Sequence, residues 1–454
     1  MSPSQLDCHS MMIVSKYFAT IKDYIDVQKV CKKYSNLITR FYYNPIPLTT
    51  ETRLYFPKLE TLHLYSDLDE KFDIEKFFRV VIWYQVDAQT ALNSSLNIVY
   101  KNISFTSEDA NLFGTSFPQN TRNLMYACFK ERQNLIDFKV PESVLYLDEC
   151  CFENCINLTS LSIGKNVSTI GEKCFLGCSQ LQHVSVPESV TSFETACFED
   201  CFSLSTLDIP KSLCFIGNFC FKGCSSLKSV ILPNEVTYIG NGCFSGCNNL
   251  KEVILSKRLF FLEDKVFSKC SNLKRITLPK SVMSIGVECF EGCGSLTRIH
   301  IPNDVSSIGE GCFSFCSSLK HIKLSKNLSI LGAGCFENCY SLKKIEIPQK
   351  IRVIRSNTFR CCNSINSVVF YSDIIEEIEA FAFAYCEKLF RVVIPQTVKT
   401  IERGSFSNCT HLKTLKFPKT IKKFGHACFY RCGLDNKLLN IPQHAIENLE
   451  EREE

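Results

Sequence analysis

The sequence predicts a repeat solenoid, in which short rungs of similar sequence stack side by side and share one elongated core. Phenylalanine recurs every 23 residues from Phe129 to Phe359, and after one 24-residue step to Phe383 the 23-residue spacing resumes. The chain has 454 residues, which is long for a single compact core. Its 45% hydrophobic and 22% charged residues are typical of an ordinary globular protein, and a net charge of +4 indicates no particular class of ligand.

The first 45 residues do not follow the repeat and predict a small helical cap. A first amphipathic helix is expected near residues 10–18. A second is expected to begin at Thr20, with Asp23 three residues later as a variant capping box, and to continue to about Phe41 before an Asn-Pro pair.

Residues 46–115 predict a capping subdomain or atypical first rungs. Residues 56–65 contain a Leu-x-x-Leu-x-Leu strand pattern, and residues 77–86 read as a strand or a buried helix. The regular solenoid is expected over residues 116–432, followed by a C-terminal cap and acidic tail over residues 433–454.

Each regular rung has the same internal order, as in the stretch CFKGCSSLKSVILPNEVTYIGNG. Val230 and Leu232 alternate as in a strand, and Pro233 ends that strand because proline has no N–H to donate. Gly240 occupies a turn position at which a positive φ is expected to be convenient. Thirteen steps at about 4.8 Å predict a stack on the order of 60 Å long.

The 28 cysteines are concentrated in the C-F-x-x-C pairs, which place two thiols one helical turn apart. Zinc ligands, inter-rung disulfides and small buried packing residues are all consistent with this spacing. Val266, Thr358, Ala382 and Ser405 replace the first cysteine in four rungs, which favours packing, because a metal ligand cannot be exchanged for Val or Ala. No metal or other cofactor is therefore expected.

The consensus CFxxCxxLxxΦxΦPxxVxxIG over residues 116–432 resembles the BspA-type leucine-rich repeat, a family found in bacterial surface antigens and in protist proteins. The resemblance implies a right-handed stack of the leucine-rich-repeat type, with parallel β-strands lining one concave face.

Basic residues recur at the outward positions of these strands and form a predicted stripe across four consecutive rungs. The residues are Arg275, Arg298, His300, His321, Lys323 and Lys344. Like charges stacked about 5 Å apart are unfavourable unless a partner supplies anions, so the stripe predicts an acidic protein surface or a phosphate-bearing ligand. A solvated face with screened charges is the alternative. Aromatic residues do not interleave with these cations, and nucleic acid is not expected to bind here.

The N-terminal string MMIVSKYFATIKDYIDVQKVCKKYSNL resembles an F-box, although the usual Leu-Pro start is missing. The resemblance implies docking to the adaptor of a cullin-type ubiquitin ligase. The adaptor-binding residues it implies are Met12, Ile13, Tyr17, Phe18, Val30 and Cys31. A helical cap that covers the apolar end of the first rung is the alternative.

Signals for catalysis are absent: the eight histidines follow no nucleophile pattern, and no phosphate-binding glycine loop occurs. We expect a non-enzymatic scaffold that binds partner proteins, with a ubiquitin-ligase substrate receptor and a cell-surface antigen or adhesin as alternatives. No secretory signal or membrane span is recognised, so a cytoplasmic location is expected, and unconventional export to the cell surface stays open.

Overall fold

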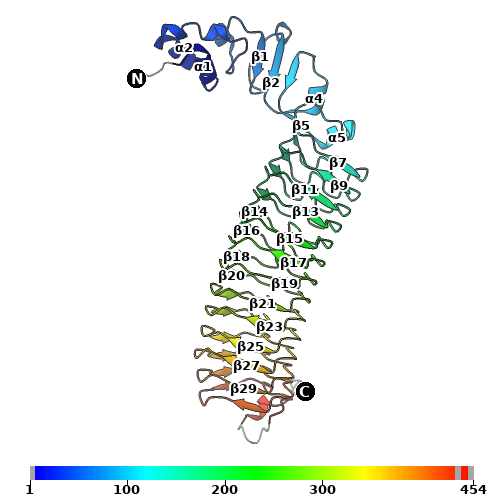
Figure 1. Ribbon diagram of the computed structural model, residues 1–454, viewed down its shortest axis with the longest axis vertical. Helices are drawn as coiled ribbons and strands as arrows, with labels where there is room; N and C mark the ends of the chain where they lie inside the picture. Colours follow the sequence, from blue (N-terminus) through cyan, green and yellow to red (C-terminus); the bar gives the residue numbers. More distant parts are fainter. Residues whose placement is uncertain (1–5, 435–440, 448–454) are drawn as a thin grey trace. The chain divides into compact units, whose positions relative to one another are not determined.

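The computed structural model describes residues 6–434 and 441–447 and divides the chain into two compact units. One unit comprises Met1–Cys128 with Ser143–Tyr146, and the other comprises Phe129–Glu142 with Leu147–Glu454. In the second unit the rungs follow one another along a single axis (Figure 1). This arrangement confirms the predicted solenoid of parallel strands.

Every regular rung contributes a first strand that pairs in parallel with neighbouring rungs. These strands are β7 (Asp137–Lys139), β9 (Ser160–Ser162), β11 (His183–Ser185), β13 (Thr206–Asp208), β15 (Ser229–Ile231), β17 (Glu252–Ile254), β19 (Arg275–Ile276), β21 (Arg298–His300), β23 (His321–Lys323), β25 (Lys344–Ile347), β27 (Ser367–Phe370), β29 (Arg391–Val393) and β31 (Thr414–Lys416).

A second, two-residue strand follows the turn after the first strand of each rung and forms another parallel ladder. These strands are β8 (Tyr146–Leu147), β10 (Thr169–Ile170), β12 (Ser192–Phe193), β14 (Phe215–Ile216), β16 (Tyr238–Ile239), β18 (Phe261–Leu262), β20 (Ser284–Ile285), β22 (Ser307–Ile308), β24 (Ile330–Leu331), β26 (Val353–Ile354), β28 (Glu377–Ile378), β30 (Thr400–Ile401) and β32 (Lys423–Phe424).

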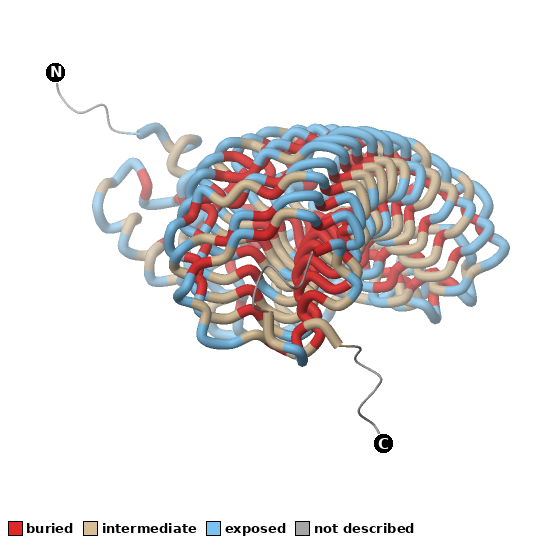
Figure 2. The backbone as a smooth tube through the Cα atoms, turned by 90° about the horizontal axis from the view of Figure 1, so that it is seen from below, coloured by how far each residue is buried: buried red, intermediate tan, exposed pale blue. Residues whose placement is uncertain are grey.

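The recurring phenylalanines form one continuous stack through the core of the solenoid. From Phe129 to Phe429, successive ring centroids lie 5.1–5.7 Å apart with interplanar angles of 1–16°. Each ring therefore contacts the ring before and after it, and no rung can bury its own phenylalanine without neighbours. Buried residues occupy the inner side of the coiled backbone (Figure 2).

The second cysteine of each C-F-x-x-C pair has a directional role in addition to packing. In thirteen rungs, from Cys155 to Cys432, its Sγ–H donates to the backbone carbonyl of the phenylalanine one rung earlier at 3.0–3.2 Å. Burial raises the pKa of Cys155 to about 12, which keeps its thiol protonated and able to donate. All 28 cysteines are free thiols in the structure.

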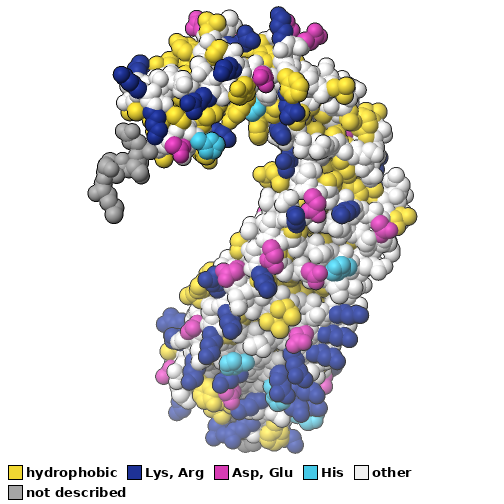
Figure 3. Space-filling view, turned by 45° about the horizontal axis from the view of Figure 1, so that its top comes forward, with side chains coloured by type: hydrophobic (Ala, Val, Ile, Leu, Met, Phe, Trp, Pro, Cys, Tyr) yellow, Lys and Arg dark blue, Asp and Glu magenta, His cyan; other side chains and the backbone are white. Residues whose placement is uncertain are grey.

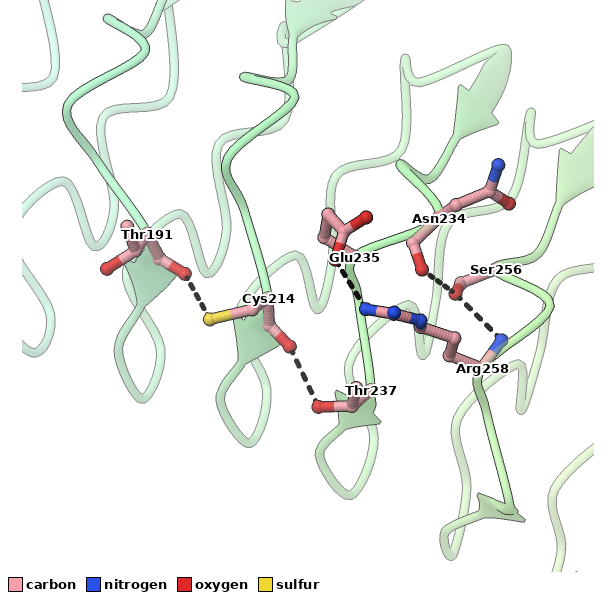
Figure 4. A network of polar contacts seen from close by, with 7 residues as sticks. All are labelled: Thr191, Cys214, Asn234, Glu235, Thr237, Ser256 and Arg258. Atoms are coloured by element: carbon pink, nitrogen blue, oxygen red, sulfur yellow. Dashed lines mark hydrogen bonds and ion pairs between the residues drawn. The ribbon is translucent and has the colours of Figure 1, made fainter.

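Polar side chains add further bonds between rungs outside the core. Cys214 and Thr237 hold equivalent positions before their second strands. The Cys214 thiol donates to the carbonyl of Thr191 at 3.2 Å, and the Thr237 hydroxyl donates to the carbonyl of Cys214 at 3.3 Å (Figure 4). Ser256, which replaces the turn proline, donates to the carbonyl of Asn234 at 3.1 Å. At Ser256, a side-chain hydrogen bond thus stabilises the turn in place of proline.

The predicted reason for the recurrent turn glycine is wrong. Gly240 does not have a left-handed φ; a Cβ there would lie 2.4 Å from the backbone nitrogen of Asn218, so close approach of the neighbouring rung favours glycine. Positive φ instead occurs two residues before and two residues after Phe244, with 59° at Gly242 and 74° at Gly246.

The N-terminal helices are shorter than predicted. Helix α1 spans Cys8–Ser15 and α2 spans Ile21–Val30, where the chain becomes extended at Cys31. The expected continuation of the second helix to Phe41 is therefore wrong; two 3₁₀ turns, η1 (Lys32–Tyr34) and η2 (Ile38–Arg40), replace it.

The predicted start of α2 is confirmed, because the Thr20 amide donates to the Asp23 carboxylate at 2.8 Å. The apolar residues of the helical segment enter one buried cluster together with residues C-terminal to position 45. The cluster comprises Tyr24, Leu37, Ile38, Phe41, Ile46, Leu48 and Phe56. The helical segment therefore shares its core with the chain that follows it.

The rest of this unit is built from shorter rungs. β1 (Thr61–Leu64), β2 (Arg79–Ile82) and β4 (Ile98–Tyr100) pair in parallel, as do β3 (Val86–Asp87), β5 (Ile103–Phe105) and β6 (Thr121–Leu124). The register pairs Thr61 with Arg79 and Val80 with Ile98, a step of 18 residues. The unit also holds α3 (Thr50–Arg53), η3 (Ile74–Lys76), α4 (Ala88–Leu92) and α5 (Ser107–Phe113).

At the C-terminal end, η5 (Gln443–Ala445) continues the pairing of the last rung. The amide of Phe429 donates to the carbonyl of Ala445 at 2.8 Å, and Ala445 is fully buried. The C-terminal cap and acidic tail predicted over residues 433–454 lie largely outside the described residues.

We expect the inter-rung thiol bond to contribute measurably to stability. Cys243→Ala removes a first-position thiol and leaves a small cavity, whereas Cys247→Ala in the same rung also removes the bond to the Phe221 carbonyl. Cys247→Ala should therefore lower the free energy of unfolding by about 0.5–1 kcal/mol more than Cys243→Ala, as measured by urea unfolding. Equal losses would show that the two thiols act only by packing.

A second prediction concerns His63, which stacks on Tyr43 with ring centroids 4.8 Å apart. Burial, followed by the nearby charge of Lys101, lowers the pKa of His63 to about 4. Since the unfolded chain binds a proton near pH 6.5, this group stabilises the fold above that pH and its contribution is lost as the pH falls toward 4.

Trp83, the single tryptophan, lies 5.8 Å from the His63 ring and reports on this unit by fluorescence. The urea concentration at the unfolding midpoint is followed by Trp83 emission. Between pH 7 and pH 4.5 this midpoint should fall further in wild-type protein than in His63→Phe, in which the phenylalanine ring retains the stacking. The same pH dependence in both proteins would disprove the assignment to His63.

Candidate partner-binding surface

The first strands of the solenoid present alternate residues to solvent. In β21 the first and third residues, Arg298 and His300, are exposed, whereas Ile299 between them is buried. The same order recurs in most first strands. One face of the solenoid is thus a row of paired outward positions whose chemistry the core leaves free.

The six basic residues predicted for this face all lie on it and are exposed. In the ladder between β21 and β23, Arg298 is the register partner of His321, and His300 is the partner of Lys323. Arg275 in β19 and Lys344 in β25 occupy the first outward position in the preceding and following rungs. We call these residues the basic stripe. Lys and Arg side chains gather over the C-terminal half of the solenoid (Figure 3).

Most cations of the basic stripe have no carboxylate partner. Lys344 pairs with Glu346 on its own strand at 2.7 Å, and this hydrogen bond raises the pKa of Lys344. Among the residues that the structure describes, no carboxylate oxygen lies within 4.0 Å of Arg275, Arg298 or Lys323. An anionic ligand could reach these cations without breaking an existing ion pair.

Elsewhere on the solenoid, lysines pair with glutamates of the neighbouring rung. Lys222 contacts Glu199 at 2.7 Å, and Lys423 contacts Glu402 at 2.9 Å. Cross-rung pairing is thus available in this architecture. In the ladder between β21 and β23, basic residues lie opposite basic residues, whereas Arg275 lies in register with Glu252 of β17 but forms no ion pair with it within 4.0 Å.

Apolar side chains interrupt the polar surface on both sides of the basic stripe. Ile231 and Ile254 are exposed at the third position of β15 and β17, and Val393 is exposed at the third position of β29. Exposed aliphatic residues in contiguous rows commonly mark protein contacts. The strand-lined face therefore combines unpaired positive charge with apolar contact area.

The six residues predicted to bind a ligase adaptor divide into two groups. Tyr17 is 87% exposed, Val30 is 79% exposed, and Ile13 is also exposed. Met12, Phe18 and Cys31 are only partly accessible, and Met12 and Phe18 pack against the buried cluster of the helical segment. The structure thus places three of the six on the surface.

Within the described ranges, no group of three His, Cys, Asp or Glu side chains is placed to hold a metal ion. No helix in this part of the chain is both long and apolar enough to span a membrane. Sequence reasoning located the strand-lined face because its outward positions have a fixed place in the repeat. It missed a hollow of about 580 Å³ that Lys323, Lys344 and Tyr371 help to line next to the 24-residue rung, because the only signal there is the extra residue.

Comparison with known proteins identifies the repeat. The BspA type leucine-rich repeat region matches residues 101–225, 193–301, 215–341, 283–388 and 376–452. No curated protein matches the chain.

Solved structures provide a second comparison. A leucine-rich repeat protein from Bacteroides ovatus is 30% identical, with a TM-score of 0.63, over 69% of this chain and 80% of its own. A leucine-rich cell surface protein from Faecalibacterium prausnitzii is 24% identical, with a TM-score of 0.42, over 70% of this chain and 87% of its own. The matched ranges span most of the sequence and coincide with the stacked rungs described above, so the chain belongs to the BspA-type leucine-rich repeat family.

Proposed function

We propose that the protein is a non-enzymatic scaffold whose strand-lined face binds an acidic surface of a partner protein. The observation that carries this proposal is the exposed group of Arg275, Arg298 and Lys323 on three successive rungs, none of which has an ion-pair partner among the described residues. Holding these cations together opposes stability in the free protein, because like charges on adjacent strands repel. A bound acidic surface would relieve that repulsion.

A binding function fits the architecture, because the repeat core uses inward residues and leaves outward residues free to vary. The adjacent apolar residues Ile231 and Ile254 would add contact area beside the charged stripe. Charge complementarity of this kind accelerates association and weakens with added salt. We further propose a cytoplasmic location, with display on the cell surface as the alternative.

We expect proteins retained from native extract by wild-type protein to depend on the basic stripe. The variant Arg275→Glu/Arg298→Glu should lose at least about 90% of them, because it replaces attraction by repulsion. The control Lys257→Glu/Lys280→Glu makes the same charge change at exposed turn residues and should retain them. Quantitative mass spectrometry at 0.1 M and 0.5 M salt provides the measurement. Equal retention by both variants, or retention independent of salt, would contradict the proposal.

A second candidate function is supported by the exposed apolar residues of the helical segment. Tyr17 and Val30 are large side chains with little contact to their own fold, as expected of a docking surface for another protein. We propose that they bind the adaptor of a cullin-type ubiquitin ligase, in which case the solenoid would select the substrate.

Point variants test this second function better than truncation, because Tyr24 and Phe41 belong to a core that continues beyond residue 45. Wild-type protein should recover an adaptor and a cullin from extract, and Tyr17→Ser/Val30→Ser should lose both. Leu68→Ser, another exposed apolar residue in the same unit, is the control and should retain both. Recovery of neither protein by the wild type would leave the helices as a cap only.

A further inference from the structure

The single 24-residue rung creates an irregularity on the strand-lined face. Residues 344–347 pair with residues 367–370 at a step of 23, whereas Val353 pairs with Glu377 at a step of 24. The extra residue therefore lies between Phe370 and Glu377. The phenylalanine stack is undisturbed there, since Phe359 and Phe383 remain 5.1 Å apart.

The extra residue changes the turn that normally begins with proline. Tyr371 lies 23 residues after Pro348, at the position where proline normally begins the turn, and it is 55% exposed. Ser372, the next residue, donates to the carbonyl of Ile351 at 2.6 Å and is buried. The turn thus anchors its backbone through Ser372 and leaves Tyr371 projecting at the surface.

Tyr371 separates two hollows. On one side a cavity of about 580 Å³ is lined by the lysines Lys323, Lys326 and Lys344, with Glu346 and Pro348. On the other side, a cavity of about 540 Å³ is lined mainly by apolar residues of β27 and β29 and the turn after them, and Tyr371 belongs to both linings. The apolar lining comprises Val368, Val369, Phe370, Val393 and Pro395.

The two hollows differ in charge. Three lysines and one glutamate give the first a net charge of +2 with histidine neutral, and Lys344 is already paired with Glu346. In the described part of the chain, no carboxylate oxygen lies within 4.0 Å of Lys323 or Lys326. The second hollow contains one charged residue, Asp373, and Val393 is 46% exposed within it.

We infer that these hollows bind an extended segment of a partner protein that presents acidic side chains and a large apolar side chain on the same side. The acidic groups would contact Lys323 and Lys326, and the apolar group would contact Val369 and Val393 across Tyr371. Side chains two residues apart in an extended segment point to the same side, so one short segment can fill both hollows. This inference rests on the proposed function, because it names the epitope of the partner on the same face.

The test measures binding of the fluorescein-labelled peptide Ser-Glu-Ser-Glu-Ser-Phe-Ser to the full chain by fluorescence anisotropy. Lys326→Glu should weaken binding at least fivefold. Lys257→Glu is the matched control, because Lys257 and Lys326 each follow a serine whose hydroxyl donates to an asparagine carbonyl one rung earlier. Lys257→Glu should leave the affinity unchanged.

The apolar hollow has its own controls. Val393→Ser should weaken binding at least threefold, whereas Ile330→Ser, at an exposed aliphatic position of β24 outside both linings, should not. A peptide with serine in place of phenylalanine should bind the wild type as weakly as the phenylalanine peptide binds Val393→Ser. Equal effects of Lys326→Glu and Lys257→Glu, or equal affinity for both peptides, would overturn the inference. Tighter binding of a peptide with phosphoserine in place of glutamate would overturn the carboxylate assignment.

The two proposals fail separately. Arg275 and Arg298 lie outside the linings of both hollows, so capture of acidic proteins tests the proposed function through Arg275→Glu/Arg298→Glu, and peptide affinity tests the hollows through Lys326→Glu. Loss of capture without any effect of Lys326→Glu on the peptide would retain the proposed function and reject the hollows. Weaker peptide binding by Lys326→Glu, together with unchanged capture by Arg275→Glu/Arg298→Glu, would retain the hollows and reject the proposed function.

Discussion

Contact between identical positions of successive rungs is the constraint on which the solenoid depends. Each phenylalanine ring lies against the next at 5.1–5.7 Å, and each second-position thiol donates to the carbonyl beside the preceding ring. Both contacts require equivalent atoms to recur at one spacing along the axis. A rung is therefore specified by its neighbours as much as by its own sequence, and the outward residues of the strands are released from this requirement.

The sequence predicts the regular rungs well, because their core and their turns recur in fixed order. The first strands, the buried phenylalanines and the exposed basic residues could all be located from the 23-residue spacing alone. The reason for Gly240 could not, because a sequence pattern does not distinguish a positive φ from close approach of the next rung. The hydrogen bond donated by the second cysteine of each pair could not be predicted either, because residue spacing does not encode the direction of a hydrogen bond.

Prediction was weaker where the repeat changes length. The 18-residue rungs before Phe129 lack the paired cysteines that mark the later rungs, so only isolated strands such as 61–64 were recognisable. The second N-terminal helix was predicted too long because Tyr34, Leu37 and Phe41 keep helical spacing, although Tyr34 ends one 3₁₀ turn and Leu37 and Phe41 flank the next. In both regions a short apolar pattern is compatible with more than one backbone path.

The ladder of thiols has a consequence for the chemistry of synthesis. In the folded solenoid, burial raises the pKa of Cys201, Cys270 and Cys339 and shields them from dissolved oxidants, so these buried thiols are chemically inert. In the nascent chain the same thiols are accessible. A sulfenic acid or disulfide formed there would remove the hydrogen bond that the thiol donates to the preceding rung, and the larger group would not fit the core. The protein is thus most vulnerable to oxidation before it folds, and rapid addition of each rung to the stack protects the cysteines of the rung before it.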